Sequence, residues 1–190
     1  GKAYQIKMYD LPEGKRATRG KSIMNFLQLT DGEKITSILP MPKDMKEMQG
    51  VSLMMVTKNG TTKKSAAESF KDVRRNGLIA IKLEEGDELL ATLFVRDEDS
   101  VILTTQNGQS IRFSHTDVRE MGRTAAGVIG MKLDKGDVIV AADKIPTGTK
   151  GAELLIMTGN GYGKKTKLSE YKVQKRGGSG IKTVKVTEKT

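Results

Sequence analysis

The stretch SLMMVTKNGTTKKS, residues 52–65, decides the fold, because it places Asn59-Gly60 between two short runs of strand-forming residues. Asn-Gly in this setting is the strongest short-range signal for a β-hairpin, and it predicts a turn whose two central residues both have positive φ. Two more apolar runs follow, LIAIKL at 78–83 and ELLATLFV at 88–95, with an acidic turn at 85–87 between them. This part of the chain therefore predicts four consecutive strands.

The hairpin turn recurs along the chain. Its pattern is Thr-x-Asn-Gly with a basic residue four positions after the glycine, found at 57–60 with Lys64, at 105–108 with Arg112 and at 158–161 with Lys165. Residues 1–7, GKAYQIK, match the tail of a fourth copy. A second pattern is a basic or glycine-containing loop, then a glycine, an apolar run and an acidic turn. Its four anchor glycines are separated by 57, 50 and 53 residues: Gly20, Gly77, Gly127 and Gly180. The two patterns together indicate a repeat protein.

Four short strands in a repeat of this length are typical of propeller blades. We therefore predict an all-β, propeller-like fold of four-stranded blades. It forms a single repeat domain over 1–190, with approximate repeats at 1–50, 51–98, 99–150 and 151–190. Short helices are expected only near 42–49 and 66–73. Because the first and last repeats are incomplete, we expect the chain to be part of a longer array.

Charge narrows the class of partner. Lys and Arg total 33 against 23 acidic residues, which gives a net charge of +10 and a pI near 9.7. Such an excess favours a polyanionic partner, nucleic acid before an anionic membrane surface. The absence of cysteine excludes disulfides, cysteine metal sites and thiol catalysis. No apolar run approaches the roughly 20 residues of a membrane-spanning helix, and GKAYQIKMYD shows no signal-peptide pattern.

Three long stretches resemble successive blades of the C-terminal domain of the DNA gyrase A subunit: 1–35, 107–133 and 165–190. The most specific is IRFSHTDVREMGRTAAGV at 111–128. The resemblance covers essentially the whole chain and implies a β-pinwheel, a propeller-like disc whose basic rim binds and wraps duplex DNA. The topoisomerase IV A subunit shares the blade pattern and is the near alternative.

The same resemblance implies a role within a larger enzyme. The chain would be a non-catalytic part of a bacterial, cytoplasmic, nucleoid-associated type II topoisomerase, with catalytic residues outside the chain. Its partners would be double-stranded DNA, the other gyrase A domains and the gyrase B subunit in an A2B2 enzyme that supercoils DNA negatively with ATP. The gyrase box Gln-Arg-Arg-Gly-Gly-Lys-Gly would precede Gly1, and Gln174–Gly180 matches it at five of seven positions as a degenerate copy.

The candidate DNA-binding residues are basic side chains that return at matching places in the repeats. In the loops before the anchor glycines they are Lys15, Arg16, Arg19, Lys21, Arg74, Arg75, Arg119, Arg123, Lys175 and Arg176. After the hairpin turns they are Lys63, Lys64, Arg112, Lys164, Lys165 and Lys167. Charges in register predict a continuous positive stripe on one rim. The glycines Gly177, Gly178 and Gly180 suit either turn geometry or the presentation of N–H groups to a phosphate.

The sequence lacks the residues that a phosphate-binding loop, a metal site or a catalytic site would need. GNGYGK at 159–164 lacks the Gly-Lys-Ser/Thr of a phosphate loop, and His115 has no cysteine or second histidine with which to bind a metal. We therefore predict no catalytic site, no cofactor and no metal. With 4% aromatic residues, stacking platforms for single strands are scarce, which favours duplex DNA. Two alternatives remain: a protein-interaction propeller with incidental charge, and an enzyme with a central site, which the single histidine disfavours.

Overall fold

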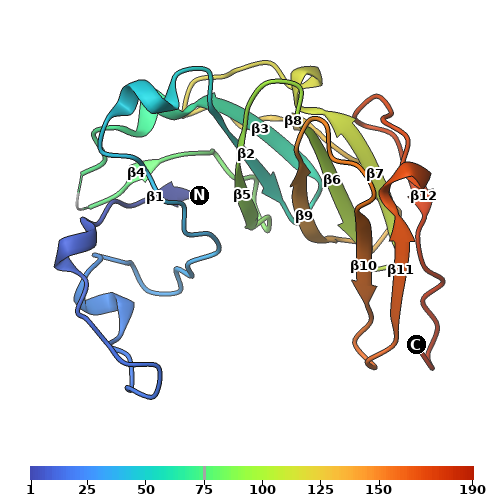
Figure 1. The fold of residues 1–190 in the computed structure, drawn as a ribbon, viewed down its shortest axis with the longest axis horizontal. Coiled ribbons are helices and arrows are strands. Elements are labelled where there is room, and N and C mark those ends of the chain that lie inside the picture. The colour runs from blue at the N-terminus through green and yellow to red at the C-terminus, as the bar shows by residue number, and fades with distance from the viewer. Residues whose placement is uncertain (75) are drawn as a thin grey trace.

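The structure is a computed structural model that describes residues 1–74 and 76–190. In these residues the regular elements are β-strands and short 3-10 helices, arranged along an open arc (Figure 1). The strands are β1 (Lys2–Ala3), β2 (Ser52–Thr57), β3 (Thr61–Ala66), β4 (Leu78–Ile79), β5 (Leu89–Val95), β6 (Ser100–Thr105), β7 (Gln109–Ser114), β8 (Val128–Ile129), β9 (Ile139–Ile145), β10 (Glu153–Met157), β11 (Gly163–Lys167) and β12 (Ile181–Lys182). The 3-10 helices are η1 (Met8–Asp10), η2 (Ile23–Asn25), η3 (Met45–Met48), η4 (Ala67–Phe70), η5 (His115–Asp117) and η6 (Leu168–Glu170). The predicted all-β fold is confirmed, and η3 and η4 lie where short helices were predicted.

Two antiparallel four-stranded sheets form complete blades at the centre of the arc, with strand orders β5-β2-β3-β8 and β9-β6-β7-β12. Strands β5 and β9 contact each other, so the two blades converge on that side, which is the inner side of the arc (Figure 1). Strands β8 and β12 therefore lie on the outer edge. Two-stranded sheets, β1–β4 and β10–β11, flank the complete blades.

The outermost strand of each blade comes from the following repeat, whereas the sequence predicts all four strands of a blade within one repeat. Strand β8 follows Gly127 but pairs with β3, and β12 pairs with β7 in the same register. The run LIAIKL keeps only Leu78 and Ile79 as a strand, which pairs with β1. This exchange interlocks neighbouring blades, because each sheet is completed by hydrogen bonds to the next repeat.

The hairpin turns are built differently from the predicted turn. Gly60 has φ 85°, but Asn59 is not in the left-handed region; the only non-glycine residue described with positive φ is Asp97. The Gly60 N–H donates to the Thr57 carbonyl at 3.2 Å, and the Thr61 N–H donates to Thr57 Oγ1 at 3.1 Å. A turn closed in this way needs one left-handed residue, the glycine, so the prediction of two was wrong. It also explains the recurring threonine, whose hydroxyl accepts the N–H beyond the turn.

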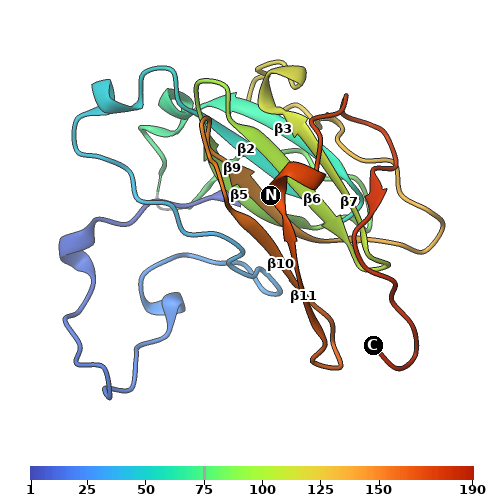
Figure 2. The same ribbon diagram turned by 45° about the vertical axis from the view of Figure 1, so that its right-hand side comes forward.

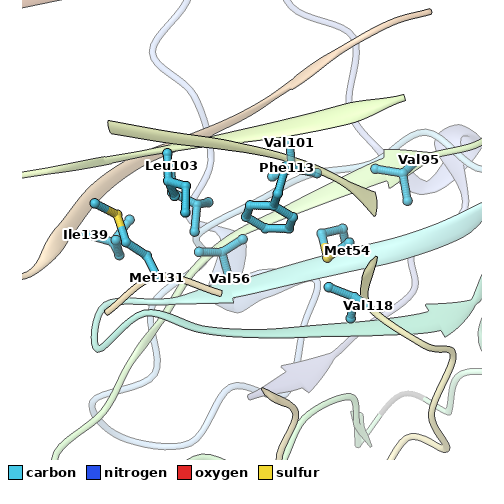
Figure 3. Packing of buried hydrophobic residues seen from close by; sticks show 10 residues of the cluster. Met54, Val56, Val95, Val101, Leu103, Phe113, Val118, Met131 and Ile139 are labelled. Atoms are coloured by element: carbon cyan, nitrogen blue, oxygen red, sulfur yellow. The ribbon is translucent and has the colours of Figure 1, made fainter. Parts of the chain in front are cut away.

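The main hydrophobic core lies between the faces of the two complete blades (Figure 3). Strand β2 contributes Met54 and Val56 to it, while Leu53 and Met55 on the opposite face join a second cluster with Phe70 and Ile81. Every residue of β2 is buried for this reason, and the strand has an unbroken apolar run instead of alternation. Packing between sheets thus fixes the angle between neighbouring blades.

Residues 4–51 contain no strand, although the repeat pattern predicts a blade here (Figure 2). Lys21 and Ser22 follow the anchor glycine as β4, β8 and β12 follow theirs, but no strand of the described residues lies beside them. A strand needs a hydrogen-bonded neighbour, so this segment forms turns and the short helices η1, η2 and η3. It is tied to β1 by Lys2, whose ammonium pairs with Glu33 Oε1 at 3.0 Å.

Gly127 and Gly136 form a matched pair that tests the interlocking of blades. Both have positive φ, +108° and +81°, but a Cβ on Gly127 would lie 2.6 Å from the Thr62 carbonyl oxygen, whereas one on Gly136 would meet nothing within 4 Å. We expect Gly136→Ala to cost about 1 kcal/mol of unfolding free energy from backbone strain. Gly127→Ala should cost about 1–3 kcal/mol more, because β8 must move away from β3. Equal losses in urea unfolding would show that close approach of the blades does not matter.

Candidate nucleic-acid interface

The basic loops reach the outer edge of the arc because each one leads into an outermost strand. Residues 71–77 precede β4, 118–127 precede β8 and 172–180 precede β12. Arg74 and Arg119 are exposed there, while Arg75 lies outside the described residues. Lys15, Arg16, Arg19 and Lys21 are exposed in the strandless segment, where Lys15 and Thr18 form a turn. The loop cations at 71–74, 118–127 and 172–180 therefore lie next to outermost strands, whereas Lys15, Arg16, Arg19 and Lys21 have no such strand beside them.

Lys63 and Lys64 do not lie on that edge, which corrects their predicted exposure. The Lys63 side chain is fully buried, and its ammonium donates to the carbonyl of Ala80, at 2.6 Å, and to that of Arg123. Lys64 is 8% exposed and donates to the His115 carbonyl at 3.2 Å. Neighbouring residues of a strand point to opposite faces, so both lysines are buried because β3 is covered on both of its faces.

Arg112 has the same internal role as Lys64. Its guanidinium donates to Ser100 Oγ at 2.8 Å and to the Leu168 and Tyr171 carbonyls at 3.5 and 3.3 Å. Leu168 and His115, which accept from Arg112 and Lys64, stand at matching places in η6 and η5. Burial lowers the pKa of Arg112 and that of Lys64. The basic residue four positions after the first two hairpin glycines, Gly60 and Gly108, is therefore a tie to the next blade and not a free rim charge.

Arg123 and Arg176 are half-buried, and each side chain donates hydrogen bonds to the preceding blade. Arg176 Nε donates to the Asp117 carbonyl at 2.9 Å, and Arg123 reaches the matching carbonyl, that of Ser69, at 3.5 Å. Lys175 pairs with the Asp117 carboxylate at 3.0 Å, although its side chain is 91% exposed. These three residues hold the loop against the preceding blade, and only the N–H groups not used in these contacts can bind a ligand.

The glycine-rich loop at 177–180 serves turn geometry. The Gly177 N–H donates to the Gly130 carbonyl at 2.6 Å, and the Gly178 carbonyl accepts the Lys132 N–H at 3.0 Å. A Cβ on Gly180 would lie 2.2 Å from the Ser110 carbonyl oxygen. The Gly177 N–H is thus engaged within the protein, and the loop's glycines allow close approach of two blades.

The third hairpin carries exposed lysines. Lys164, Lys165 and Lys167 all lie on β11. Lys164 donates to the Thr183 carbonyl at 3.1 Å, and Lys165 pairs with Glu153 at 2.9 Å. The Lys165–Glu153 pair is at the surface, where an ion pair is worth at most about 1 kcal/mol, so a phosphate can compete for Lys165. The Lys164 contact is a part-buried hydrogen bond to a main-chain carbonyl.

One cleft brings rim cations of two blades together. It has a volume of about 500 Å³ and is bordered by Lys71 and Arg74 from one repeat and Arg123 from the next, with Glu68 and Asp72 also on its wall. The acidic residues reduce its net charge. Adjacent blades therefore both border this cleft. Its wall carries both positive and negative side chains, unlike the wall of an anion-binding pocket.

The described residues offer little for other chemistry. His115 is buried, and its Nε2 lies 2.6 Å from the Asp97 carbonyl oxygen. No group of three His, Asp or Glu side chains is placed to hold a metal in the part of the chain that the structure describes. Nor does that part contain a helix with the length and apolar character to cross a membrane.

Lys63 should make stability depend on pH above neutrality. Burial, aided by the charge of Arg123, lowers the pKa of Lys63 to about 8 from 10.5. Between these values the unfolded chain binds the proton and the folded chain does not, so the free energy of unfolding should rise with pH. A neutral amine keeps two N–H donors for its two carbonyls. In urea unfolding from pH 7 to 10, the free energy of unfolding of the wild type should rise above pH 8 relative to that of Lys63→Met. A constant difference between the two would refute the assignment.

Comparisons with known proteins agree with this architecture. A family model described as "DNA gyrase C-terminal domain, beta-propeller" matches residues 1–40, 52–96, 99–146 and 152–189. The chain is 41% identical to the DNA gyrase A subunit of Escherichia coli (strain K12) and 38% identical to that of Staphylococcus epidermidis, in each case over 189 residues. These alignments cover 100% of this chain and 21% of each relative, so the chain spans about a fifth of their length.

Two solved structures are similar over most of the chain. "Structure of DNA gyrase A C-terminal domain" superposes with a TM-score of 0.82 at 30% identity, covering 100% of this chain and 59% of that one. "Crystal structure of the C-terminal domain of DNA topoisomerase IV" gives a TM-score of 0.81 at 28% identity, covering 92% and 53%. The resemblance predicted from the blade sequences is confirmed.

Proposed function

Because the chain belongs to the family of DNA gyrase C-terminal β-propeller domains, we propose that it binds duplex DNA along its outer edge and bends it. The observation that supports the proposal is the set of exposed cations in the loops before β4, β8 and β12 and on strand β11. After the internally engaged residues are set aside, this set is Arg74, Arg119, Lys165 and Lys167, with the outward parts of Arg123, Lys164, Lys175 and Arg176. Lys15, Arg16, Arg19 and Lys21 are exposed in the strandless segment, and we assign them the same role from their place in the repeat.

Phosphate contacts of this kind position a duplex without recognising its sequence. Lysine and arginine reach phosphate oxygens from any base pair, and with 4% aromatic residues the chain has few rings on which single strands could stack in series. Preference among duplexes then comes from how easily they bend around the arc. The protein therefore acts as a curved cationic support for DNA and performs no chemistry on it.

The role of the chain within a whole enzyme is inferred from its similarity to gyrase A subunits. We infer that the chain serves a bacterial DNA gyrase. Its partners there are the other domains of the A subunit together with the B subunit. The breaking of DNA and the use of ATP for negative supercoiling are assigned to parts of the enzyme outside this chain. The nucleoid in the cytoplasm would be its place of action. The topoisomerase IV A subunit stays the alternative, and a supercoiling assay of the whole enzyme separates them, since gyrase introduces supercoils.

A competition experiment tests the proposed binding. The chain is titrated into a fluorescently labelled 40-base-pair duplex at 100 mM salt, and unlabelled duplexes of unrelated sequence and single strands then compete. We expect the duplexes to compete almost equally and the single strands to compete less well. Strong selection of one short sequence, or no binding at all, would exclude the proposal. Early elution from heparin would instead favour a protein-interaction module with incidental charge.

A further inference from the structure

Three exposed lysines occupy one repeated position that the predicted DNA-binding set omits. Lys82, Lys132 and Lys185 each stand five residues after an anchor glycine, those at 77, 127 and 180. All three are exposed, although the residue just before two of them, Ile81 and Met131, is buried. A single exposed lysine is ordinary on a protein surface, whereas a lysine at the same position of three repeats indicates a repeated role.

The backbone before each lysine is held in the same way. The carbonyl of the preceding repeat's hairpin glycine accepts two N–H groups, those three and four residues after the anchor glycine. Gly1 O accepts from Ala80 and Ile81, Gly60 O from Gly130 and Met131, and Gly108 O from Thr183 and Val184, at 2.8–3.3 Å. The lysine is the next residue, so the fold brings it out at the same point of each repeat.

That point lies at the outer edge. Each lysine follows closely on an outermost strand, β4, β8 or β12. The N–H groups of Lys82 and Lys132 also donate to matching residues of the next basic loop, Ala125 and Gly178, at 3.2 and 3.0 Å. Two of the lysines are therefore hydrogen-bonded directly to the loops that carry the first set of cations.

These ammonium groups are free for a ligand. In the described part of the chain no carboxylate lies within ion-pairing distance of Lys82, Lys132 or Lys185, even though Glu84 and Asp134 are only two residues away. Lys63, Lys64 and Arg112, by contrast, are occupied within the protein. Periodic, exposed and unpaired cations beside a basic loop suit a periodic polyanion.

We propose that Lys82, Lys132 and Lys185 form a second row of phosphate contacts, one in each repeat, after the outermost strand that the basic loop of the same repeat precedes. The row rests on the proposed DNA binding. The loop cations and these lysines then alternate along the edge, so that each repeat offers the duplex two cationic points. Each repeat then contacts the DNA before and after its outermost strand.

The test compares two variants of equal net charge. One changes Lys82, Lys132 and Lys185 to glutamine. The control changes three exposed lysines outside the basic loops and outermost strands, Lys43, Lys46 and Lys150. Each variant lowers the net charge from +10 to +7, a loss of 3. Binding of a 40-base-pair duplex is measured from 50 to 300 mM salt, with thermal unfolding as the check on folding.

The row variant should reduce the slope of log affinity against log salt by about 2 to 3, since each phosphate contact contributes about 0.9. The control should change the slope by less than about 1. Lysine-to-arginine changes in the row should keep the wild-type slope, which guards against loss of folding. Equal slopes for row and control, with a steep wild type, would overturn the row alone. A wild type without salt-dependent binding would overturn both the row and the proposed function.

Discussion

Raising the salt concentration from 50 to 200 mM should weaken the binding of duplex DNA by about 10³- to 10⁴-fold. The outer edge offers enough free cations to neutralise about five to eight phosphates, each of which releases counterions, so the slope of log affinity against log salt should be about −5 to −7. A fourfold change in salt raised to that power gives the expected loss. Fluorescence anisotropy titrations at four or five salt concentrations measure it.

The same titrations separate the proposed function from its alternative. A protein-interaction propeller with incidental charge would bind DNA weakly and show a shallow slope at every salt concentration. A slope near zero would therefore contradict binding along the edge. So would an affinity that persists at high salt for one sequence only, because that result requires contacts to base edges that phosphate binding does not supply.

Arg112→Met should lower stability and Arg119→Met should weaken DNA binding, although the two arginines are only seven positions apart in the sequence. Arg112→Met removes the donor to Ser100 Oγ and to two carbonyls at the blade junction, and groups left without partners typically cost about 1–3 kcal/mol. We expect urea unfolding to show a loss of about that size, with DNA affinity unchanged where the protein is folded. Arg119 is exposed, so Arg119→Met should change stability by less than about 0.5 kcal/mol and weaken DNA binding several-fold.

If the two variants exchanged these effects, the roles assigned to Arg112 and Arg119 would be wrong. If Arg112→Met weakened DNA binding without loss of stability, its guanidinium would have to face the DNA and the tie to η6 would be incidental. If Arg119→Met unfolded the protein, the loop at 118–127 would be a structural element and not a binding one. Lys63→Met and Lys64→Met extend the comparison, since both lysines are also buried at blade junctions.

The strands could be predicted from the sequence because the local signals are strong. The Thr-x-Asn-Gly turns and the apolar runs around them predict β2 and β3 nearly to the residue. The partner of the run at 78–83 could not be predicted, because its side chains carry no sign of which hairpin it will join. The missing strands after Gly20 have the same origin, since a strand depends on a neighbour that the local sequence does not describe.

The basic residues could be located by repeat but not sorted by role. Lys63 and Lys64 are adjacent on one strand, and alternation predicts that one of them faces solvent. Both are buried, because strand β3 is covered on both faces: Lys64 contacts His115 of the next blade, and Lys63 contacts the Ala80 carbonyl of its own repeat. Charge alone does not distinguish a lysine that donates to carbonyls from one that awaits a phosphate. The row at Lys82, Lys132 and Lys185 could have been found by extending the repeat alignment five residues past each anchor glycine.

The central claim is that the outer edge holds duplex DNA in a bend, and end-to-end energy transfer tests it most directly. A 30-base-pair duplex with a dye at each end is titrated with the chain at 50 mM salt. Bending a duplex of 20–30 base pairs by 40–90° costs about 1–6 kcal/mol, which the phosphate contacts must offset. We expect transfer to rise on binding, but less than with the longer gyrase A C-terminal domain, because this chain covers 59% of that structure. Binding that leaves the transfer efficiency unchanged would show that the DNA stays straight and would contradict the account.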